Sequence, residues 1–250
     1  MVRRGRWQGM MTIVRFNWPF YAASAFLLLA SLLVGLSRMS PAVRTVALIV
    51  FLGAAYFFVV SLAVSHQVYD RSDLYRWHWL DRALGSTVVP EMILCYTGFD
   101  ESSAALRQYF QATRWTILDH FDEKKMTEPS IRRARRIFPP SADTQAASFD
   151  RWPVSDGLSN VVFGLLAIHE LRHESERIAW FLEAKRCLKA GGRIIIAEHV
   201  RDLPNAVAFG PGVLHFHSAR SWRRCWEAAG LRLVDEFRPT LWVTVFVFTA

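Results

Sequence analysis

The sequence predicts an α/β domain with a mostly parallel sheet that ends in an antiparallel strand pair, preceded by two transmembrane helices. Two uncharged apolar runs, residues 16–37 and 45–65, stand near the start of the 250-residue chain. From residue 88 onward, short apolar runs alternate with helical patterns, and the last two strand-like runs follow one another directly. Alternation of strands and helices favours a parallel sheet covered by helices, and two successive strands favour a hairpin at its edge.

Each apolar run is long enough to cross a bilayer, whose hydrocarbon core needs about 20 helical residues. The basic leader that contains Arg6 and Arg15 would also suit a signal peptide. The first run is too long for the apolar part of a signal peptide, however, and a second run follows at once. A buried helical hairpin of a soluble protein would carry more polar positions. We therefore expect a transmembrane hairpin over residues 1–66.

Lys and Arg residues near the ends of the runs predict the orientation of the hairpin, because they favour the cytoplasmic side. The N-terminal flank holds four Arg, the loop between the runs two, and the segment after the second run three; they are Arg3, Arg4, Arg6 and Arg15, then Arg38 and Arg44, then Arg71, Arg76 and Arg82. This distribution predicts an integral membrane protein with both termini and the α/β domain in the cytoplasm.

Composition narrows the possible partners. Three widely spaced cysteines give neither a disulfide framework nor a zinc motif. Arg residues near the spans explain much of the net charge of +8, since such residues meet anionic lipid. A second basic stripe comprises Arg132, Arg133, Arg135 and Arg136. It lacks the aromatic or groove-entering elements of nucleic-acid-binding proteins, so we expect a solvated or lipid-facing surface and no nucleic-acid partner.

Residues 67–87 form a predicted juxtamembrane amphipathic helix or linker. Leu74, Trp77, Leu80 and Leu84 fall on one helical face. The tryptophans there suit the lipid head-group layer, but the same face would equally suit packing against the following domain.

The domain over residues 88–250 is read as seven strands and four helices. The predicted strands are residues 92–96, 115–119, 145–149, 160–165, 193–197, 231–237 and 241–248. The predicted helices are residues 102–112, 130–137, 173–188 and 218–229, of which the last two end before glycines.

Three motifs in this domain resemble a known family. Trp-Pro-Val-Ser-Asp-Gly at 152–157 leads into the fourth strand, Leu-Lys-Ala-Gly-Gly at 188–192 precedes the fifth, and Ala-Gly-Leu at 229–231 enters the sixth. Together with the element order, they resemble class I S-adenosylmethionine-dependent methyltransferases, in particular the type 11-like group. The resemblance implies a Rossmann-like methyltransferase domain and S-adenosyl-L-methionine as the cofactor.

The resemblance also implies a set of cofactor-binding residues at the ends of the first four strands: Thr97, Gly98, Asp100, Asp119, Phe149 and Leu165. Asp119 stands where the family's acidic residue accepts the two ribose hydroxyls, and Asp100 with Glu101 could pair with the cofactor's ammonium group. Two features depart from the family pattern. A single glycine replaces the G-x-G-x-G loop, and Ser148 replaces an acidic residue. These departures leave open a decayed cofactor site.

Polar residues also follow the fourth and fifth strands, where ligands of open α/β sheets bind. His169 and Glu170 come after the fourth strand, Glu198 and His199 after the fifth, and His215 in the next loop. One hypothesis is general-base catalysis, with His199 as the base, Glu198 or Glu170 orienting it, and His169 and His215 beside it.

Two alternatives stand beside that hypothesis. Structural ion pairs could join Glu170 to Arg201 or Glu198 to Arg172. A metal site of His and Glu ligands is the other, but no metal-binding spacing supports it, so no metal is predicted.

The predicted activity is methyl transfer to a hydrophobic or membrane-associated acceptor, in the first place O-methylation of a phenol, quinol or lipid hydroxyl. Methylation of a phospholipid amine is an alternative of the same class. A non-catalytic membrane scaffold on a decayed methyltransferase fold is the alternative of a different class. The expected partners are the bilayer and a small-molecule or lipid acceptor.

Overall fold

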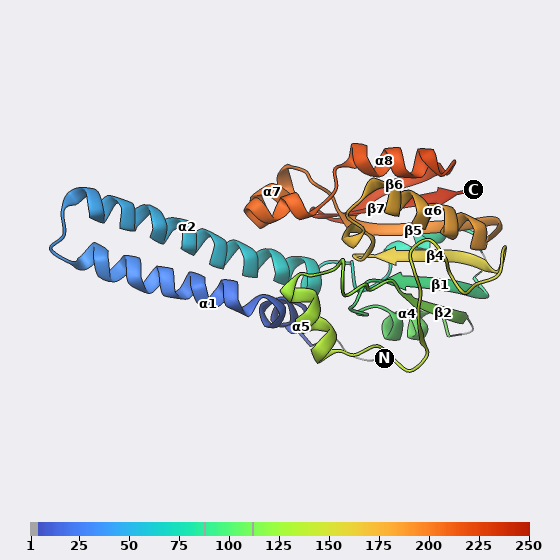
Figure 1. The fold of residues 1–250 in the computed structure, drawn as a ribbon, viewed down its shortest axis with the longest axis horizontal. Helices are drawn as coiled ribbons and strands as arrows, with labels where there is room; N and C mark the ends of the chain where they lie inside the picture. Colours follow the sequence, from blue (N-terminus) through green and yellow to red (C-terminus); the bar gives the residue numbers. More distant parts are fainter. Residues whose placement is uncertain (1–4, 88, 112) are drawn as a thin grey trace.

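The computed structural model describes residues 5–87, 89–111 and 113–250. Val88 and Ala112, which bound a predicted domain and a predicted helix, lie outside the described residues, as do Arg3 and Arg4 of the basic leader. A long hairpin of α1 (Gln8–Leu36) and α2 (Pro41–His66) projects from one end of an α/β domain (Figure 1).

Both helices of the hairpin are long and apolar enough to cross a membrane. Only 17% of the most apolar window of α1 and 6% of that of α2 is buried, so their apolar surface faces outward. A few polar contacts join the helices, including Tyr21 Oη to Ser61 Oγ at 2.7 Å. α1 is kinked at Asn17, two residues before Pro19, which removes a backbone donor and crowds the preceding turn.

The segment between hairpin and sheet is not the continuous amphipathic helix that the sequence suggests. A π-turn, η1 (Gln67–Arg71), ends α2, and the short α3 (Trp79–Leu84) follows a bend at Trp77, whose φ is +69°. The predicted apolar face is nevertheless buried against the sheet. Trp79 donates its indole N–H to the Leu74 carbonyl at 2.9 Å, so these tryptophans pack inside the domain and not in a head-group layer.

Within the residues that the structure describes, seven strands form one sheet with the order β3-β2-β1-β4-β5-β7-β6. They are β1 (Glu91–Tyr96), β2 (Arg114–Asp119), β3 (Thr144–Ala146), β4 (Ser159–Leu165), β5 (Leu188–His199), β6 (Arg232–Thr240) and β7 (Val243–Thr249). Only β7 runs antiparallel, between β5 and β6. The predicted mostly parallel sheet with a terminal antiparallel pair is confirmed.

Side chains of α6 (Glu174–Cys187) and α8 (Ala219–Ala228) pack on one face of this sheet, and those of α3, α4 (Ser103–Tyr109) and α7 (Leu203–Phe209) pack on the other. The helix α5 (Pro129–Ile137) lies beside the base of the hairpin (Figure 1). The predicted loop that contains His215 is helical: residues 203–209 form α7, and a 3₁₀ helix, η3 (Gly210–His215), follows directly. Asp202 caps α7 by accepting the Asn205 N–H at 3.1 Å, and Pro204 occupies its first turn.

The carboxyl ends of the parallel strands face the hairpin (Figure 1). Hydrogen bonds join the hairpin to the α/β domain. Tyr56 of α2 donates its hydroxyl to the Val207 carbonyl of α7 at 2.6 Å. On the other side, Arg133 of α5 donates to the Phe16 carbonyl of α1, also at 2.6 Å. The edge where ligands of α/β sheets bind therefore lies next to the apolar hairpin.

Candidate functional site

Strand order reverses between β1 and β4, and a small cavity lies at this point. Its volume is about 40 Å³, little more than one water molecule occupies. The lining residues come from the ends of β1 and β4 and from the segment between the hairpin and the sheet (residues 67–87), called the connecting segment below. They include Tyr75, Phe99, Asp100, Glu101, Leu165 and Leu166. Leu165, Asp100 and Glu101, which the sequence assigns to the cofactor, thus share one cavity.

Gly98 shapes the turn that follows β1. Its φ is +78°, and a Cβ built there would lie 2.9 Å from side-chain carbons of Phe121 and Ile131. The Gly98 N–H donates to Asp119 Oδ1 at 2.9 Å. The predicted cofactor loop is therefore packed against the end of β2 and against α5.

Asp119 is buried at the end of β2, and its carboxylate is held by the chain itself. Oδ1 also accepts the Phe121 N–H at 3.0 Å, and Oδ2 pairs with the Arg135 guanidinium of α5. Arg135 in turn lies 4.4 Å from the centre of the Phe121 ring. Both oxygens that would meet ribose hydroxyls are thus engaged by backbone and by Arg135.

The carboxylates after β1 have partners as well. Asp100 holds the turn that leads into α4: it accepts the Ser102 and Ser103 N–H groups at 3.1 and 2.9 Å, and the Ser103 hydroxyl. Glu101 accepts the Tyr75 hydroxyl at 2.5 Å. The first role of Asp100 is therefore to fix this turn.

The remaining predicted cofactor residues are spread around this edge. Thr97 donates its hydroxyl to the Ala167 carbonyl at 2.8 Å and so ties the end of β1 to the turn after β4. Phe149 lies beneath the Lys125 ammonium, 4.8 Å from the ring centre. The structure does not bring Phe149 into the cavity beside Leu165.

A second polar group gathers where β4 and β5 end. Glu198, which is fully buried, accepts three backbone N–H groups on Oε1, from Ala167, Ile168 and His169, at 2.7 to 3.3 Å. Its Oε2 lies 2.6 Å from His169 Nδ1. Glu198 therefore fixes the orientation of the His169 ring.

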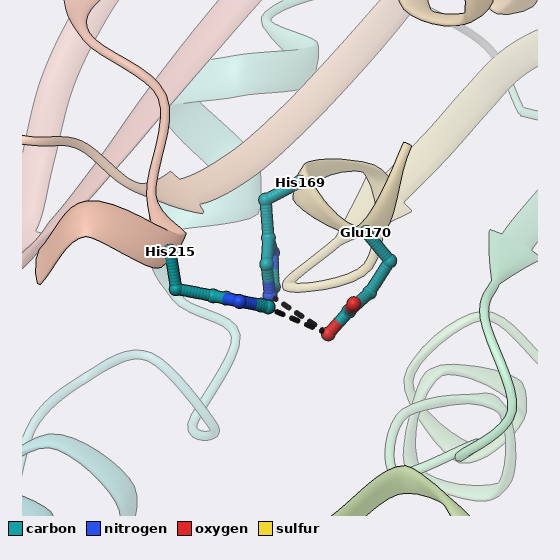
Figure 2. Close-up of side chains that lie close together, drawn as sticks. All are labelled: His169, Glu170 and His215. Carbon is teal, nitrogen blue, oxygen red and sulfur yellow. Dashed lines mark hydrogen bonds and ion pairs between the residues drawn. The ribbon is translucent and has the colours of Figure 1, made fainter. Parts of the chain in front are cut away.

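His169, Glu170 and His215 converge from two segments, the turn after β4 and the end of η3 (Figure 2). Glu170 Oε1 lies 3.5 Å from His169 Nε2 and 3.3 Å from His215 Nε2. Burial opposes charge on His169, but the Glu198 and Glu170 carboxylates outweigh it and raise the pKa of His169 to about 10. Burial raises the pKa of Glu170, but the hydrogen bonds to His169 and His215 outweigh burial and lower this pKa.

His199 is not part of this group, which corrects the expectation that Glu198 or Glu170 orients it. Its Nδ1 lies 2.9 Å from the Trp242 carbonyl, and its Nε2 lies 3.2 Å from the Tyr69 hydroxyl. Phe216 stacks on its ring at 4.9 Å and also contacts His169. Burial lowers the pKa of His199 to about 4, so it is a weak base.

The predicted ion pairs of Glu170 with Arg201 and of Glu198 with Arg172 do not form either. Arg172 donates to the His215 carbonyl at 2.5 Å, and Arg201 donates to the carbonyls of Phe216 and Leu214, both at 2.8 Å. The guanidinium groups hold the backbone that carries His215 instead of pairing with Glu198 or Glu170.

Sequence reasoning missed Arg135 and the tyrosines of the connecting segment. Tyr69 reaches His199 across 130 residues of sequence, and Arg135 reaches Asp119 across 16. No local pattern marks such pairs. Arg135 belongs to the Arg stripe of α5, which predicts a solvated or lipid-facing surface, but its guanidinium pairs with the buried Asp119.

No protein-family model matches the sequence, and no curated protein matches it. Solved structures do. An S-adenosylmethionine-dependent methyltransferase from Aquifex aeolicus has a TM-score of 0.50 and 13% identity, over 73% of this chain and 92% of that chain. The pyocyanin biosynthetic protein PhzM has a TM-score of 0.50 and 10% identity, over 75% of this chain and 57% of that chain. The predicted class I methyltransferase fold is confirmed.

Proposed function

We propose that this chain is a membrane-anchored S-adenosylmethionine-dependent methyltransferase for a hydrophobic acceptor. One observation carries the proposal: on a sheet of this strand order, the carboxylates after β1 line a cavity at the switch point, Asp119 at the end of β2 binds the same loop through the Gly98 N–H, and that edge faces an apolar hairpin. An acceptor dissolved in the bilayer would reach such a site without crossing bulk water, and tethering raises its effective concentration.

The carboxylates at this edge are of the chemical type that S-adenosylmethionine needs. Asp119 suits ribose hydroxyls, and Asp100 with Glu101 suits an ammonium group. Space is the obstacle, since a cavity of about 40 Å³ is far below the ~300 Å³ or more of ordinary ligand pockets. Binding therefore requires α5 to withdraw Arg135 from Asp119, with a shift of the Phe121 and Ile131 side chains that pack on Gly98.

When bound, the cofactor supplies an electrophilic methyl group, whose bond to sulfur breaks as the acceptor oxygen bonds to its carbon. The chain's own task is then to orient that oxygen and remove its proton. The group of His169, Glu170 and His215 stands at the adjacent strand ends, and His215 is its most exposed side chain. His169 already carries a proton at neutral pH and the lowered pKa of Glu170 makes it a weak base, so we assign proton removal within this group to His215 and not to His199. A phenol, quinol or lipid hydroxyl is the acceptor class, and its location in the bilayer follows from the hairpin.

Titration calorimetry of the full chain in detergent with S-adenosylmethionine tests the proposal. Saturable binding of one molecule per chain, competed by S-adenosylhomocysteine, is the expected result. Methyl transfer to a total lipid extract, followed with methyl-labelled cofactor and mass spectrometry, would then identify the acceptor.

A second candidate is a non-catalytic membrane protein on a methyltransferase fold. The ion pair of Arg135 with Asp119 favours it, because the chain already satisfies the carboxylate that a cofactor would need. Absence of binding both to the natural chain and to the variant Arg135→Met would favour this candidate over the enzyme.

A further inference from the structure

We infer that His169, Glu170 and His215 form a binding site for a first-row divalent transition metal ion. Their ligand atoms (His169 Nε2, Glu170 Oε1 and His215 Nε2) all lie within 4.8 Å of one another. In a tetrahedral site with bonds of about 2.1 Å, neighbouring ligand atoms stand about 3.4 Å apart. The two distances to Glu170, 3.5 and 3.3 Å, already have this length.

The hydrogen bonding around His169 directs its second ring nitrogen at Glu170. Glu198 can only accept, so His169 donates its Nδ1–H to it at 2.6 Å. In a neutral ring, Nε2 is then an acceptor, and it faces the acceptor oxygen of Glu170. A divalent ion would take the place of the proton that His169 otherwise carries on Nε2, and it would satisfy all three ligand atoms at once.

Glu198 is the partner that metal-bound histidines typically have. A carboxylate on the far nitrogen of the ring fixes its tautomer and raises its strength as a ligand. Here Oε1 of that carboxylate is itself held by three backbone N–H groups, so the orientation is fixed before any ion binds. The charges also balance, because Glu170 and Glu198 together offset one divalent ion.

An unpartnered atom points to the same site independently. Glu170 Oε2 is buried, and within the described part of the chain it has no hydrogen-bond partner. An unsatisfied buried carboxylate oxygen is costly, and a metal ion bound in bidentate fashion, or water on that ion, would satisfy it.

The ligand types select the metal class. Two imidazoles and one carboxylate suit Zn²⁺ and its neighbours, whereas Mg²⁺ and Ca²⁺ prefer oxygen ligands throughout. Three protein ligands leave a position open, as in catalytic sites, and the 29% exposure of the His215 side chain gives access from solvent. A hydroxyl bound there would lose its proton more readily; this use, but not metal binding itself, rests on the proposed methyl transfer.

Zn²⁺ titration of the full chain in detergent, after removal of metal with a chelator, tests the inference. We expect one Zn²⁺ per chain. His215→Ala and Glu170→Gln should each weaken binding at least about 100-fold, since loss of a supporting partner alone costs 10–100-fold. His78→Ala, which removes an exposed histidine outside the group, should bind Zn²⁺ like the natural chain.

Cobalt(II) provides a second measurement, because its visible absorption reports coordination by these ligands and should disappear in His215→Ala. Circular dichroism of each variant shows whether it is folded. A chain without Zn²⁺ binding, or folded variants that bind as tightly as the natural chain, would overturn the site in favour of a protonated ion-pair cluster. S-adenosylmethionine binding is measured on the same samples, so failure of the proposed function is recorded separately.

Discussion

Gly98 joins the end of β1 to the end of β2 in a conformation that other residues adopt at a cost. Its φ of +78° and the 2.9 Å approach of Phe121 and Ile131 leave no room for a side chain. Gly98→Ala should lower the free energy of unfolding by about 1–2 kcal/mol from backbone strain alone, seen as a lower melting temperature in detergent.

Gly212→Ala is the matched control. The nearest atom to a Cβ at Gly212 is Phe209 Cβ at 3.7 Å, an ordinary contact. Its melting temperature should match that of the natural chain, and equal losses for both variants would refute a special role of Gly98.

The ion pair of Arg135 with Asp119 should compete with the cofactor. Arg135→Met frees Oδ2 of Asp119 and removes the step of breaking the pair, so we expect S-adenosylmethionine to bind about 10-fold more tightly. Asp119→Asn should weaken binding by ~1–3 kcal/mol, because the charged acceptor is lost. Titration calorimetry measures both.

Arg136→Met serves as the control, since it removes the same charge from an exposed position of α5. Should it tighten binding as much as Arg135→Met does, the effect would come from net charge and not from release of Asp119.

His120 makes the junction of β2, α6 and the turn after β3 sensitive to acid. Burial lowers its pKa to about 4, although the Ala147 carbonyl and Asp119 act in the opposite direction. Its Nε2 accepts the Trp180 indole N–H at 3.2 Å, so the folded state requires the neutral ring. The unfolded chain takes up a proton near pH 6.5, whereas the folded chain does so only near pH 4.

Stability should therefore fall as pH falls from about 6.5 to about 4, by up to ~1.4 kcal/mol per pH unit for this one proton. His120→Gln keeps a donor and an acceptor but does not titrate, so its unfolding should depend less on pH in this window. His78→Gln, at an exposed site, should behave as the natural chain does. An unchanged slope for His120→Gln would contradict the assignment.

At the scale of elements, α7 and η3 present apolar side chains beside the hairpin. Leu203, Val207 and Leu214 are 75%, 52% and 64% exposed, and α7 contacts α2. If the hairpin spans a membrane, we expect these exposed apolar groups beside it to enter the bilayer surface. An environment-sensitive fluorophore on Leu214→Cys should shift to the blue in vesicles and be quenched by brominated lipid.

Labelling is selective because Cys95, Cys187 and Cys225 are all buried. Leu182→Cys is the control: Leu182 is 48% exposed but belongs to α6, away from the hairpin (Figure 1). Equal quenching at the two positions, or none at Leu214→Cys, would show that η3 does not enter the bilayer.

The central strands were predictable from sequence because they are short apolar runs bounded by polar residues, and helices because their apolar residues recur with helical spacing. The short polar strand β3 (Thr144–Ala146) ends three residues earlier than the predicted third strand, because no apolar run marks its end. The interruption of the helix between α2 and α3 could not be predicted, because burial of Leu74 and Trp77 against the sheet overrides the helical pattern. At the site, the histidine and glutamate positions after β4 and β5 followed from strand ends alone. Which of them meet depends on Phe216 and on contacts between distant segments, which no local pattern contains.

At the scale of the whole molecule, the hairpin and the site are attached to the same segment of the chain, the segment between α2 and β1. The base of α1 is held by Asp70, which accepts the Gly9 and Met10 N–H groups at 2.6 and 3.0 Å. An acidic side chain at a helix N-terminus stabilises that end. The hairpin is thus fixed to the segment that also supplies Tyr69 and Tyr75 to the site, so a bilayer that the hairpin spans would have a set position relative to the site.

This arrangement predicts the topology of the chain in a membrane. If α1 and α2 both cross, their short connection around Ser40 lies on the far side from the α/β domain, and the Arg distribution predicts that this domain is cytoplasmic. A reporter inserted at Ser40 should therefore be accessible from outside the cell, and one fused after Ala250 only after permeabilisation. Carbonate extraction should leave the full chain in the membrane fraction, whereas a peripheral protein would be released. Release by carbonate, or a reporter at Ser40 that is reached only from the cytoplasm, would show that the hairpin packs against the membrane or another protein without spanning the bilayer.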